Sequence, residues 1–478
     1  MTTLPPPASP PASIPATPGP PPPQRHAAVA IIAAGAVLAG WLAAGPLPAD
    51  QAIALALAIF SIGLWASSAL PEYLTALCFF LLAILLKVAP PTVIFSGFNS
   101  STFWLLFSGL ITGAAVRHTA LDQRWANSLA ALMSQRYGSV IGTIVAFSVA
   151  LSFVLPSSIG RAVLLIPIIT SLAGRLGYAP GSNGRTGMLL ATALGTHIPA
   201  FTILPANVPN MLMAGTAETL YGYAPTYTQY LLLHFPVLGM LKSLVLAGLI
   251  LWLFPAGPAH PDGQIRRART SPTPPQRRLM IALALCLAFW MTDSLHHIAP
   301  AWISMAAGTY FLWPGSGLTS KRCINEEINM GSLLFIGGVM GLGAIVAATG
   351  LGGALVEAAG TYVGLGNGAA WQKVAMLGGI GTLVALFTTL PGVPAIMTPL
   401  AASLSDTTGL PIATVLMSQV LAFSNVILPY QSPPLLVAIQ LGKIDLRAAT
   451  RLCLALAAVT LLVLTPLDLL WWHLLGWI

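Results

Sequence analysis

The chain has 478 residues, of which 56 % are hydrophobic and 7 % are charged, and its formal net charge is +8. Soluble domains carry about 25 % charged residues, so this composition excludes an ordinary soluble protein and indicates a polytopic membrane protein. The basic residues lie in short segments between apolar runs and not on one patch, so nucleic acid is not an expected partner. The four scattered cysteines form no CxxC pair, and they indicate neither a metal site nor a disulfide framework.

The apolar runs are long and do not alternate strictly, which favours helices over a membrane barrel. A helix needs about 20 apolar residues to cross the hydrocarbon. The sequence therefore predicts an all-α polytopic membrane protein with about 11 transmembrane helices and two re-entrant helical hairpins. The spans are expected at residues 27–44, 51–69, 73–89, 102–118, 187–217, 230–254, 279–293, 299–313, 331–349, 411–441 and 452–477, and the hairpins at about 138–172 and 371–405. Spans 187–217 and 411–441 are too long for one simple helix and contain polar interruptions.

The N-terminal segment 1–26 is rich in Pro, Ala, Ser and Thr, and we expect a disordered cytoplasmic tail. It is followed by a first helix (27–50), a first repeat (51–254), a basic cytoplasmic linker (255–278) and a second repeat (279–478). A cytoplasmic N-terminus places most of the 20 Lys and Arg residues in cytoplasmic segments, as the positive-inside rule requires. The expected location is the bacterial inner membrane, with the C-terminus on the outer face.

The two repeats share local patterns. Leu105-Leu106-Phe107-Ser108-Gly109 recurs as Leu333-Leu334-Phe335-Ile336-Gly337, and each copy precedes a hairpin. Pro167 of the first hairpin matches Pro399 of the second, and Val208-Pro209-Asn210 matches Pro433-Pro434-Leu435. Each repeat holds five spans, so the copies insert with opposite orientation. Inverted repeats with broken helices at matching places are typical of secondary transporters with a central binding site.

Four polar breaks interrupt the apolar runs, at residues 156–161, 195–210, 388–394 and 424–434. Each break opens a helix N-terminus, whose free N–H groups and positive dipole suit an anion. Hydrocarbon offers no partner for free backbone groups, so the breaks are expected to lie inside the protein around one site. The candidate substrate-binding residues are Ser157, Ser158, Arg161, Thr196, His197, Asn207, Asn210, Thr388, Thr389, Gly392, Ser424, Asn425, Gln431 and Ser432.

Two of these residues are ionisable. An Arg near the bilayer centre costs about 2.5 kcal/mol or more, so Arg161 is expected to contact an anion. The alternative is that Arg161 snorkels or pairs with a buried acid, for which Asp293 and Asp406 are the nearest candidates. His197 suits proton coupling because imidazole titrates near neutral pH. The alternative is a histidine that is hydrogen-bonded to a carbonyl of the break.

The sequence resembles the divalent-anion:sodium symporter family of the ion transporter superfamily. The matching pieces are Gly97-Phe98-Asn99 through Leu121, its counterpart 331–351, the two hairpins, Asn207-Val208-Pro209-Asn210 and 428–434. The resemblance implies a homodimer in which a scaffold domain holds mobile transport domains that move as elevators. It implies small anions such as dicarboxylates, citrate or sulfate as substrates. The family's paired Ser-Asn-Thr motifs hold substrate and sodium, which suggests sodium sites at Ser157, Ser158, Gly195, Thr389 and Ser424.

The motifs depart from the family pattern, because Ser158 stands at the first Asn position and Leu390 at the second offers no side-chain oxygen. Sodium coupling, proton coupling, exchange and facilitated flow therefore stay open, and no other cofactor is expected. Ser157 and His197 could form a dyad on paper, but an intramembrane enzyme gives the repeated breaks no role, so the chain is not expected to be an enzyme. A sensor that has kept the carrier fold and lost transport is the remaining alternative.

Overall fold

The computed structural model describes residues 22–132, 136–155, 157–259 and 271–478, and every regular element in those ranges is helical. Most of the predicted N-terminal tail and the middle of the basic linker lie outside them. The helix α1 (Pro22–Ala43) begins five residues before the expected start at residue 27. Proline is compatible with a first helical turn, where its missing N–H would have no partner. The prediction of an all-α polytopic membrane protein is confirmed.

Seven helices in the described residues have the length and hydropathy to cross a membrane. They cover His26–Ala43, Ala49–Ser67, Ser158–Arg175, Tyr227–Leu253, Met330–Ala348, Ala370–Phe387 and Leu446–Leu474. Two of the seven are arms of the predicted hairpins, so length alone does not separate a span from a re-entrant arm. Shorter apolar helices account for other expected segments. Glu72–Leu85 is one expected span, Tyr137–Ser152 is the first arm of the first hairpin, and Ile412–Phe423 and Pro433–Gly442 are the two parts of the expected span 411–441.

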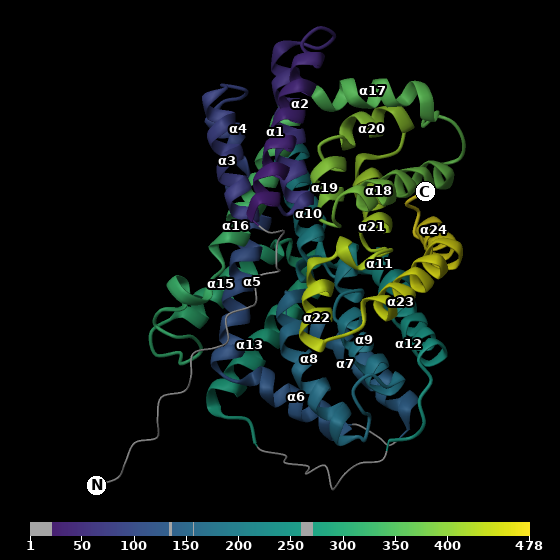
Figure 1. Cartoon of the computed structure of the whole chain (residues 1–478). Helices are drawn as coiled ribbons and strands as arrows, with labels where there is room; N and C mark the ends of the chain where they lie inside the picture. Colours follow the sequence, from purple (N-terminus) through teal and green to yellow (C-terminus); the bar gives the residue numbers. More distant parts are fainter. Residues whose placement is uncertain (1–21, 133–135, 156, 260–270) are drawn as a thin grey trace.

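The helices form two stacks that lie side by side (Figure 1). One stack holds α1, α2 (Ala49–Ser67), α3 (Glu72–Leu85), α4 (Pro91–Ile94), α5 (Ser101–His118), α13 (Pro274–Met291), α15 (Pro300–Leu312) and α16 (Met330–Ala348). The other holds α7 (Tyr137–Ser152), α8 (Ser158–Arg175), α9 (Asn183–Gly195), α11 (Tyr227–His234), α12 (Lys242–Leu253), α18 (Ala370–Phe387), α20 (Ala401–Thr408), α21 (Ile412–Phe423), α22 (Pro433–Gly442), α23 (Leu446–Val459) and α24 (Thr465–Leu474). The helix α10 (Val208–Tyr221) packs against α5 and α16 and lies between the stacks.

The two hairpins enter from opposite ends of the molecule, as inverted copies do (Figure 1). The arms α7 and α8 lie in the lower part of the view, with α6 (Leu121–Leu132) across the lower end. The arms α18 and α20 lie in the upper part, with α17 (Leu351–Val363) across the upper end. Each hairpin's first arm packs on the first half of a broken helix, α7 on α9 and α18 on α21.

Both long polar spans are broken, as expected. The first runs as α9, the 3-10 turns η2 (Pro199–Thr202) and η3 (Leu204–Ala206), and α10. The second runs as α21, the turn η6 (Pro429–Gln431) and α22. A proline begins or directly follows the start of each of these turns and of the helices after them, and proline cannot donate the backbone bond that continues a helix.

The second hairpin differs from its expected form, because its return arm is divided into α19 (Gly392–Met397) and α20 at Pro399. The matching Pro167 lies inside the continuous helix α8. The Tyr221 hydroxyl lies 2.9 Å from the carbonyl oxygens of both Thr398 and Pro399. A partner from α10 thus satisfies carbonyls at the break, and the sequence around the two prolines does not reveal this difference.

Each repeat ends in one long helix, and each of these two helices contains a π-helical segment. These segments are η4 (Phe235–Leu241), between α11 and α12, and η7 (Thr460–Leu464), between α23 and α24. π-segments are rare and occur frequently at functional sites, because they rotate the side chains that follow them. Lys242 follows the first π-segment directly, and Asp468 lies in the first turn of the helix after the second.

Candidate functional site

The first helix break is a loop held by its own amide side chains. The Asn210 Nδ2 donates to the carbonyl oxygens of Ala200 at 2.8 Å and Ile203 at 2.9 Å. The Tyr230 hydroxyl donates to the Phe201 carbonyl at 2.8 Å. Carbonyls freed from a helix need such partners inside a membrane. Asn210 therefore supports the loop with its nitrogen, while its Oδ1 has no hydrogen-bond partner.

The second break is tied to the tip of the second hairpin by Gln431. The Gln431 Oε1 accepts hydrogen bonds from the backbone N–H groups of Ile427 and Leu428, each at 2.8 Å. Its Nε2 donates to the Ala385 carbonyl at 2.8 Å, and its carbonyl accepts from the Leu390 N–H at 2.9 Å. All of these bonds are to backbone groups of the protein, so Gln431 has a structural role in the site.

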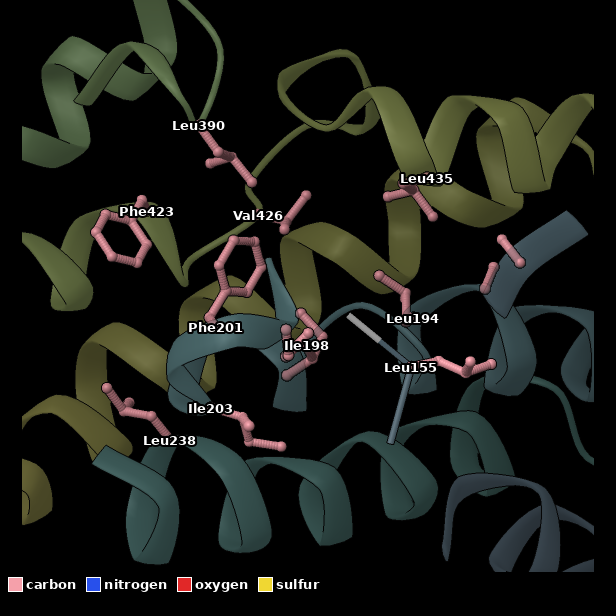
Figure 2. Close-up of a cluster of buried hydrophobic side chains, with 14 of the residues drawn as sticks. Leu155, Leu194, Ile198, Phe201, Ile203, Leu238, Leu390, Phe423, Val426 and Leu435 are labelled. Atoms are coloured by element: carbon pink, nitrogen blue, oxygen red, sulfur yellow. The ribbon is translucent and has the colours of Figure 1, made fainter. Parts of the chain in front are cut away.

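The two breaks meet directly. The His197 Nε2 lies 2.6 Å from the Ser432 hydroxyl, and both side chains are buried. Beside them, the ring centroids of Phe201 and Phe423 lie 6.0 Å apart. Figure 2 shows buried apolar side chains that come from both breaks and both hairpin tips and gather in one cluster, among them Leu155, Ile198, Leu390 and Val426. The predicted convergence of the four breaks is therefore what the structure shows.

Arg161 joins the first hairpin to the first break. Its side chain is fully buried, and its Nε donates to the Thr196 carbonyl at 3.0 Å. One terminal nitrogen donates to the Leu155 carbonyl, and the other donates to the Ser158 hydroxyl at 2.9 Å and the Ala206 carbonyl at 3.3 Å. The guanidinium has five N–H donors, and four of them bond protein oxygens here. Arg161 is thus a cross-link whose bonds go mainly to backbone carbonyls.

The two acids considered as partners for Arg161 lie elsewhere. Asp293 accepts hydrogen bonds from the Tyr227 N–H and, at 3.0 Å, from the Thr228 hydroxyl. Asp406 is exposed and lines a surface cavity of about 580 Å³ beside α17 and α20. Of the residues that the structure describes, none places a carboxylate oxygen within 4.0 Å of the Arg161 guanidinium. The buried-acid interpretation is therefore wrong, and Arg161 keeps an uncompensated charge inside the site.

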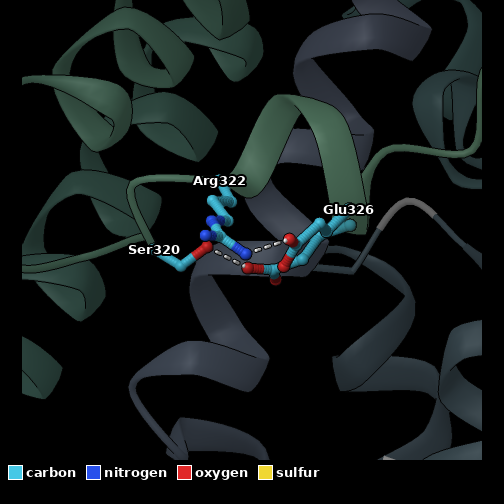
Figure 3. Close-up of polar contacts among 4 residues, drawn as sticks. Ser320, Arg322 and Glu326 are labelled. Carbon is cyan, nitrogen blue, oxygen red and sulfur yellow. Dashed lines mark hydrogen bonds and ion pairs between the residues drawn. The ribbon is translucent and has the colours of Figure 1, made fainter.

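A surface ion pair between Arg322 and Glu326 contrasts with the buried, unpaired charge of Arg161. Arg322 Nη1 lies 3.0 Å from Glu326 Oε1, and the neighbouring Ser320 hydroxyl donates to Glu327 at 2.7 Å (Figure 3). The two paired side chains are 76 % and 58 % exposed, as expected for a solvated loop. Exposed pairs contribute about 0–1 kcal/mol, so this loop has no energetic role comparable to that of a buried cation.

Several buried polar atoms around the joined breaks have no hydrogen-bond partner. A buried polar atom without a partner costs about 1–3 kcal/mol, so such atoms need an explanation. They are candidates for binding a polar ligand because they are already free to bond it. In this region they are His197 Nδ1, Asn207 Nδ2, Asn210 Oδ1, Ser424 Oγ, and both Asn425 Oδ1 and Asn425 Nδ2.

Other predicted site residues act within the protein. The Ser157 hydroxyl is exposed and caps α8 by accepting from the Gly160 N–H at 3.1 Å, so it does not form a dyad with His197. The hydroxyls of Thr196 and Thr388 donate to carbonyls one turn back, at 2.8 and 2.7 Å. Thr389 and Gly392 are half-buried at the second tip, and Gly195 is the last residue of α9.

Sequence reasoning missed Lys242 and Asp468. The Lys242 ammonium is fully buried and donates to the Ser424 carbonyl at 2.9 Å. The Asp468 carboxyl is fully buried in α24, and neither of its oxygens has a hydrogen-bond partner. The available signal was a single charge inside each of two apolar spans, since such charges usually mark functional positions.

Inverted repeats, broken helices and a buried polar site at their junction define a secondary membrane transporter. Residues 25–478 match the family described as the sodium:sulfate symporter transmembrane region, and the chain belongs to that family. It is 27 % identical over 395 residues to a membrane protein of Cupriavidus necator, covering 80 % of this chain and 77 % of that one. It is 22 % identical over 433 residues to an uncharacterized transporter of Haemophilus influenzae, covering 87 % of this chain and 91 % of that one.

The fold is also similar to a solved structure, the YdaH transporter of Alcanivorax borkumensis, described as having an unusual topology. The TM-score is 0.56 at 16 % identity, covering 85 % of this chain and 99 % of the other. At this identity the similarity concerns the fold alone. The chain is therefore a multi-span transporter of the sodium:sulfate symporter family and not an enzyme.

Proposed function

We propose that this transporter carries small anions, either di- and tricarboxylates or sulfate, and binds them at the joined breaks. The observation that carries the proposal is the group of unpaired buried donors, namely His197 Nδ1 when that nitrogen carries the proton, Asn207 Nδ2, Ser424 Oγ and Asn425 Nδ2. The unpaired Oδ1 atoms of Asn210 and Asn425 are acceptors and do not bond anion oxygens. Amide and hydroxyl groups can bond anion oxygens without adding a permanent charge that would hold the substrate too firmly.

The charge of the site favours an anion. Arg161 brings a positive charge that no described carboxylate offsets within 4.0 Å. The helices α8, α10 and α22 begin at the hairpin tip and the two breaks, so their positive N-terminal dipoles add to this field. Because Arg161 bonds carbonyls, it acts on the anion through its field and by holding the tip in place. The direct contacts are assigned to the unpaired amides and hydroxyls.

An elevator movement is the proposed mechanism. The two stacks of Figure 1 give a scaffold and a transport body, and α6 and α17 connect them at opposite ends. The helix α10 continues the broken helix that begins with α9 of the transport body, and it contacts α5 of the scaffold through Glu218. The Glu218 Oε2 accepts from the Ser101 N–H at 2.9 Å and from the Ser101 hydroxyl at 2.8 Å. We further propose a homodimer in the bacterial inner membrane with a cytoplasmic N-terminus and an outer C-terminus, consistent with the positive-inside rule.

The test is uptake of labelled succinate, citrate and sulfate into proteoliposomes, with sodium and proton gradients imposed separately. Saturable uptake of at least one of these anions, absent from protein-free liposomes, is expected. No uptake of any anion under either gradient would contradict anion transport and would favour a sensor on the carrier fold.

A further inference from the structure

Two buried cations, both from the first repeat, bond carbonyls at equivalent points of the two repeats. Thr196 is the C-cap residue of α9, and Ser424 is the C-cap residue of α21, so each ends the first half of a broken helix. The Thr196 carbonyl accepts from Arg161 Nε at 3.0 Å, and the Ser424 carbonyl accepts from Lys242 Nζ at 2.9 Å. Arg161 and Lys242 are both fully buried.

These positions attract cations for a general reason. The last carbonyls of a helix have no partner within the helix and carry the negative end of its dipole. In discontinuous membrane helices such carbonyls coordinate the coupling cation of a transporter. Each of the two positions is therefore where a bound monovalent cation is expected.

The oxygen set around Arg161 is that of a small cation site. It comprises the carbonyls of Thr196, Leu155 and Ala206 and the hydroxyl of Ser158, drawn from the hairpin tip and the first break. All four oxygens are neutral. The guanidinium fills this set, so a sodium ion bound to the same oxygens would have to displace it and would lie against a like charge in a dry interior.

Three of the five residues expected to hold sodium already use an oxygen on another group of the protein, while the Ser424 hydroxyl itself has no partner. Ser158 bonds Arg161 through its hydroxyl, and Ser424 bonds Lys242 through its carbonyl. Ser157 uses its hydroxyl as the cap of α8. Neither Arg161 nor Lys242 has a described carboxylate oxygen within 4.0 Å.

We propose that Arg161 and Lys242 are resident cations that fill both cation positions of the fold, so that this chain transports its anion without binding sodium. The statement that transport needs no sodium rests on the proposed anion transport. That Arg161 and Lys242 occupy the two cation positions is a property of the protein and does not depend on transport. A cation that is part of a side chain cannot be released on the other side of the membrane. A sodium gradient therefore cannot drive this transporter through these two positions.

The decisive experiment measures melting of the purified protein in lipid nanodiscs while NaCl replaces choline chloride at constant ionic strength. A ligand that binds only the folded state raises the melting temperature in a saturable way. The wild type is expected to show no sodium-specific rise. The Arg161→Ala variant vacates the four oxygens, so sodium or added guanidinium is expected to raise its melting temperature by about 3 °C or more.

Two variants control this result. Arg161→Lys keeps a cation in place and is expected to show no sodium effect. Arg175→Ala removes an exposed Arg from the last turn of the same helix and is expected to behave as the wild type. For the second position, Lys242→Ala is combined with Asp468→Asn so that no lone carboxylate stays buried, and this pair is expected to gain sodium-dependent stabilisation.

A saturable sodium-specific stabilisation of the wild type would overturn the proposal. A folded Arg161→Ala protein that responds to neither sodium nor guanidinium would overturn the assignment of Arg161. If the Arg161→Ala variant does not fold, the sodium dependence of melting in the wild type and in Arg161→Lys still tests the proposal. In proteoliposomes, uptake of whichever of succinate, citrate or sulfate is carried should be equal in sodium and choline. If none is carried, the proposed function fails while the melting measurements still decide this proposal.

Discussion

The imidazole of His197 lies 2.6 Å from the hydroxyl of Ser432, although the two residues are 235 positions apart in the chain. His197 belongs to the first helix break, and Ser432 begins the helix after the second. This contact makes one site of two breaks that belong to different repeats. It also assigns His197 a partner, a side-chain hydroxyl, in place of the break carbonyl that the alternative interpretation expected.

The His197–Ser432 contact should appear as non-additive stability. We expect the double variant of His197→Ala and Ser432→Ala to lose less stability than the sum of the losses in the two single variants. The coupling of directly bonded residues is about 0.5–3 kcal/mol. Ser432 also caps α22, accepting from Leu435 N–H at 3.3 Å, so the exposed cap Ser157→Ala serves as the control for losing a cap alone. Simple additivity would contradict a direct bond.

Gln431 should be a structural residue. The change Gln431→Ala leaves two N–H groups and the Ala385 carbonyl without their partners, at about 1–3 kcal/mol for each buried group. The melting temperature is expected to fall by at least about 5 °C. Gln440→Ala removes an exposed Gln from α22 and should leave melting unchanged. Unaltered melting of Gln431→Ala would show that the second break does not need this anchor.

Glu218 should govern the movement of the two bodies and not substrate affinity. Its carboxylate bonds the first residue of α5, where the helix dipole strengthens the contact. Glu218→Gln weakens this bond and is expected to change the maximal transport rate more than twofold while the half-saturating anion concentration stays the same. Glu326→Gln, which breaks the surface ion pair, should change neither value. An altered half-saturating concentration would instead connect Glu218 with the substrate site.

Membrane orientation can be tested with exposed lysine and arginine positions. Lys87 is expected to lie outside and Arg447 in the cytoplasm, and both are exposed. Cysteines introduced as Lys87→Cys and Arg447→Cys should react differently with a membrane-impermeant maleimide. Lys87→Cys should be labelled in intact cells, and Arg447→Cys only after permeabilisation. The native Cys286, Cys323 and Cys453 are buried and Cys78 is half-buried, so the protein without an introduced cysteine serves as the background control. The reverse labelling would invert the proposed topology.

The sequence allowed the architecture to be predicted because its signals are local. Apolar runs, the matching prolines and the polar interruptions predicted an all-helical membrane protein with two hairpins and two broken helices. The partners of the site residues could not be predicted in this way. The bonds of Arg161 to Thr196 and Ala206 depend on how the first hairpin packs on the first break, which no spacing reveals.

The π-segments could not be predicted for a different reason. A π-segment depends on one extra residue per turn, which leaves the apolar pattern of a membrane helix nearly unchanged. The interruption of the second hairpin at Pro399 likewise depends on the Tyr221 hydroxyl from another helix. A lone charge in an apolar span remains the one usable sign, and both Lys242 and Asp468 carry it.

Asn425 offers the most direct test of the anion site. Its side chain is buried, and neither its Oδ1 nor its Nδ2 has a partner in the protein. Removing the amide therefore breaks no hydrogen bond of the ligand-free protein, whereas a hydrogen bond to a charged ligand contributes about 1.5–3 kcal/mol, or about tenfold or more in affinity.

The measurement is the stabilisation of purified wild type and Asn425→Ala by titrated succinate, citrate or sulfate. The wild type should show saturable stabilisation by at least one anion. Asn425→Ala should melt at the same temperature without anion and need at least about tenfold more of it for half the effect. Equal anion responses in the two proteins would contradict a binding site at the joined breaks.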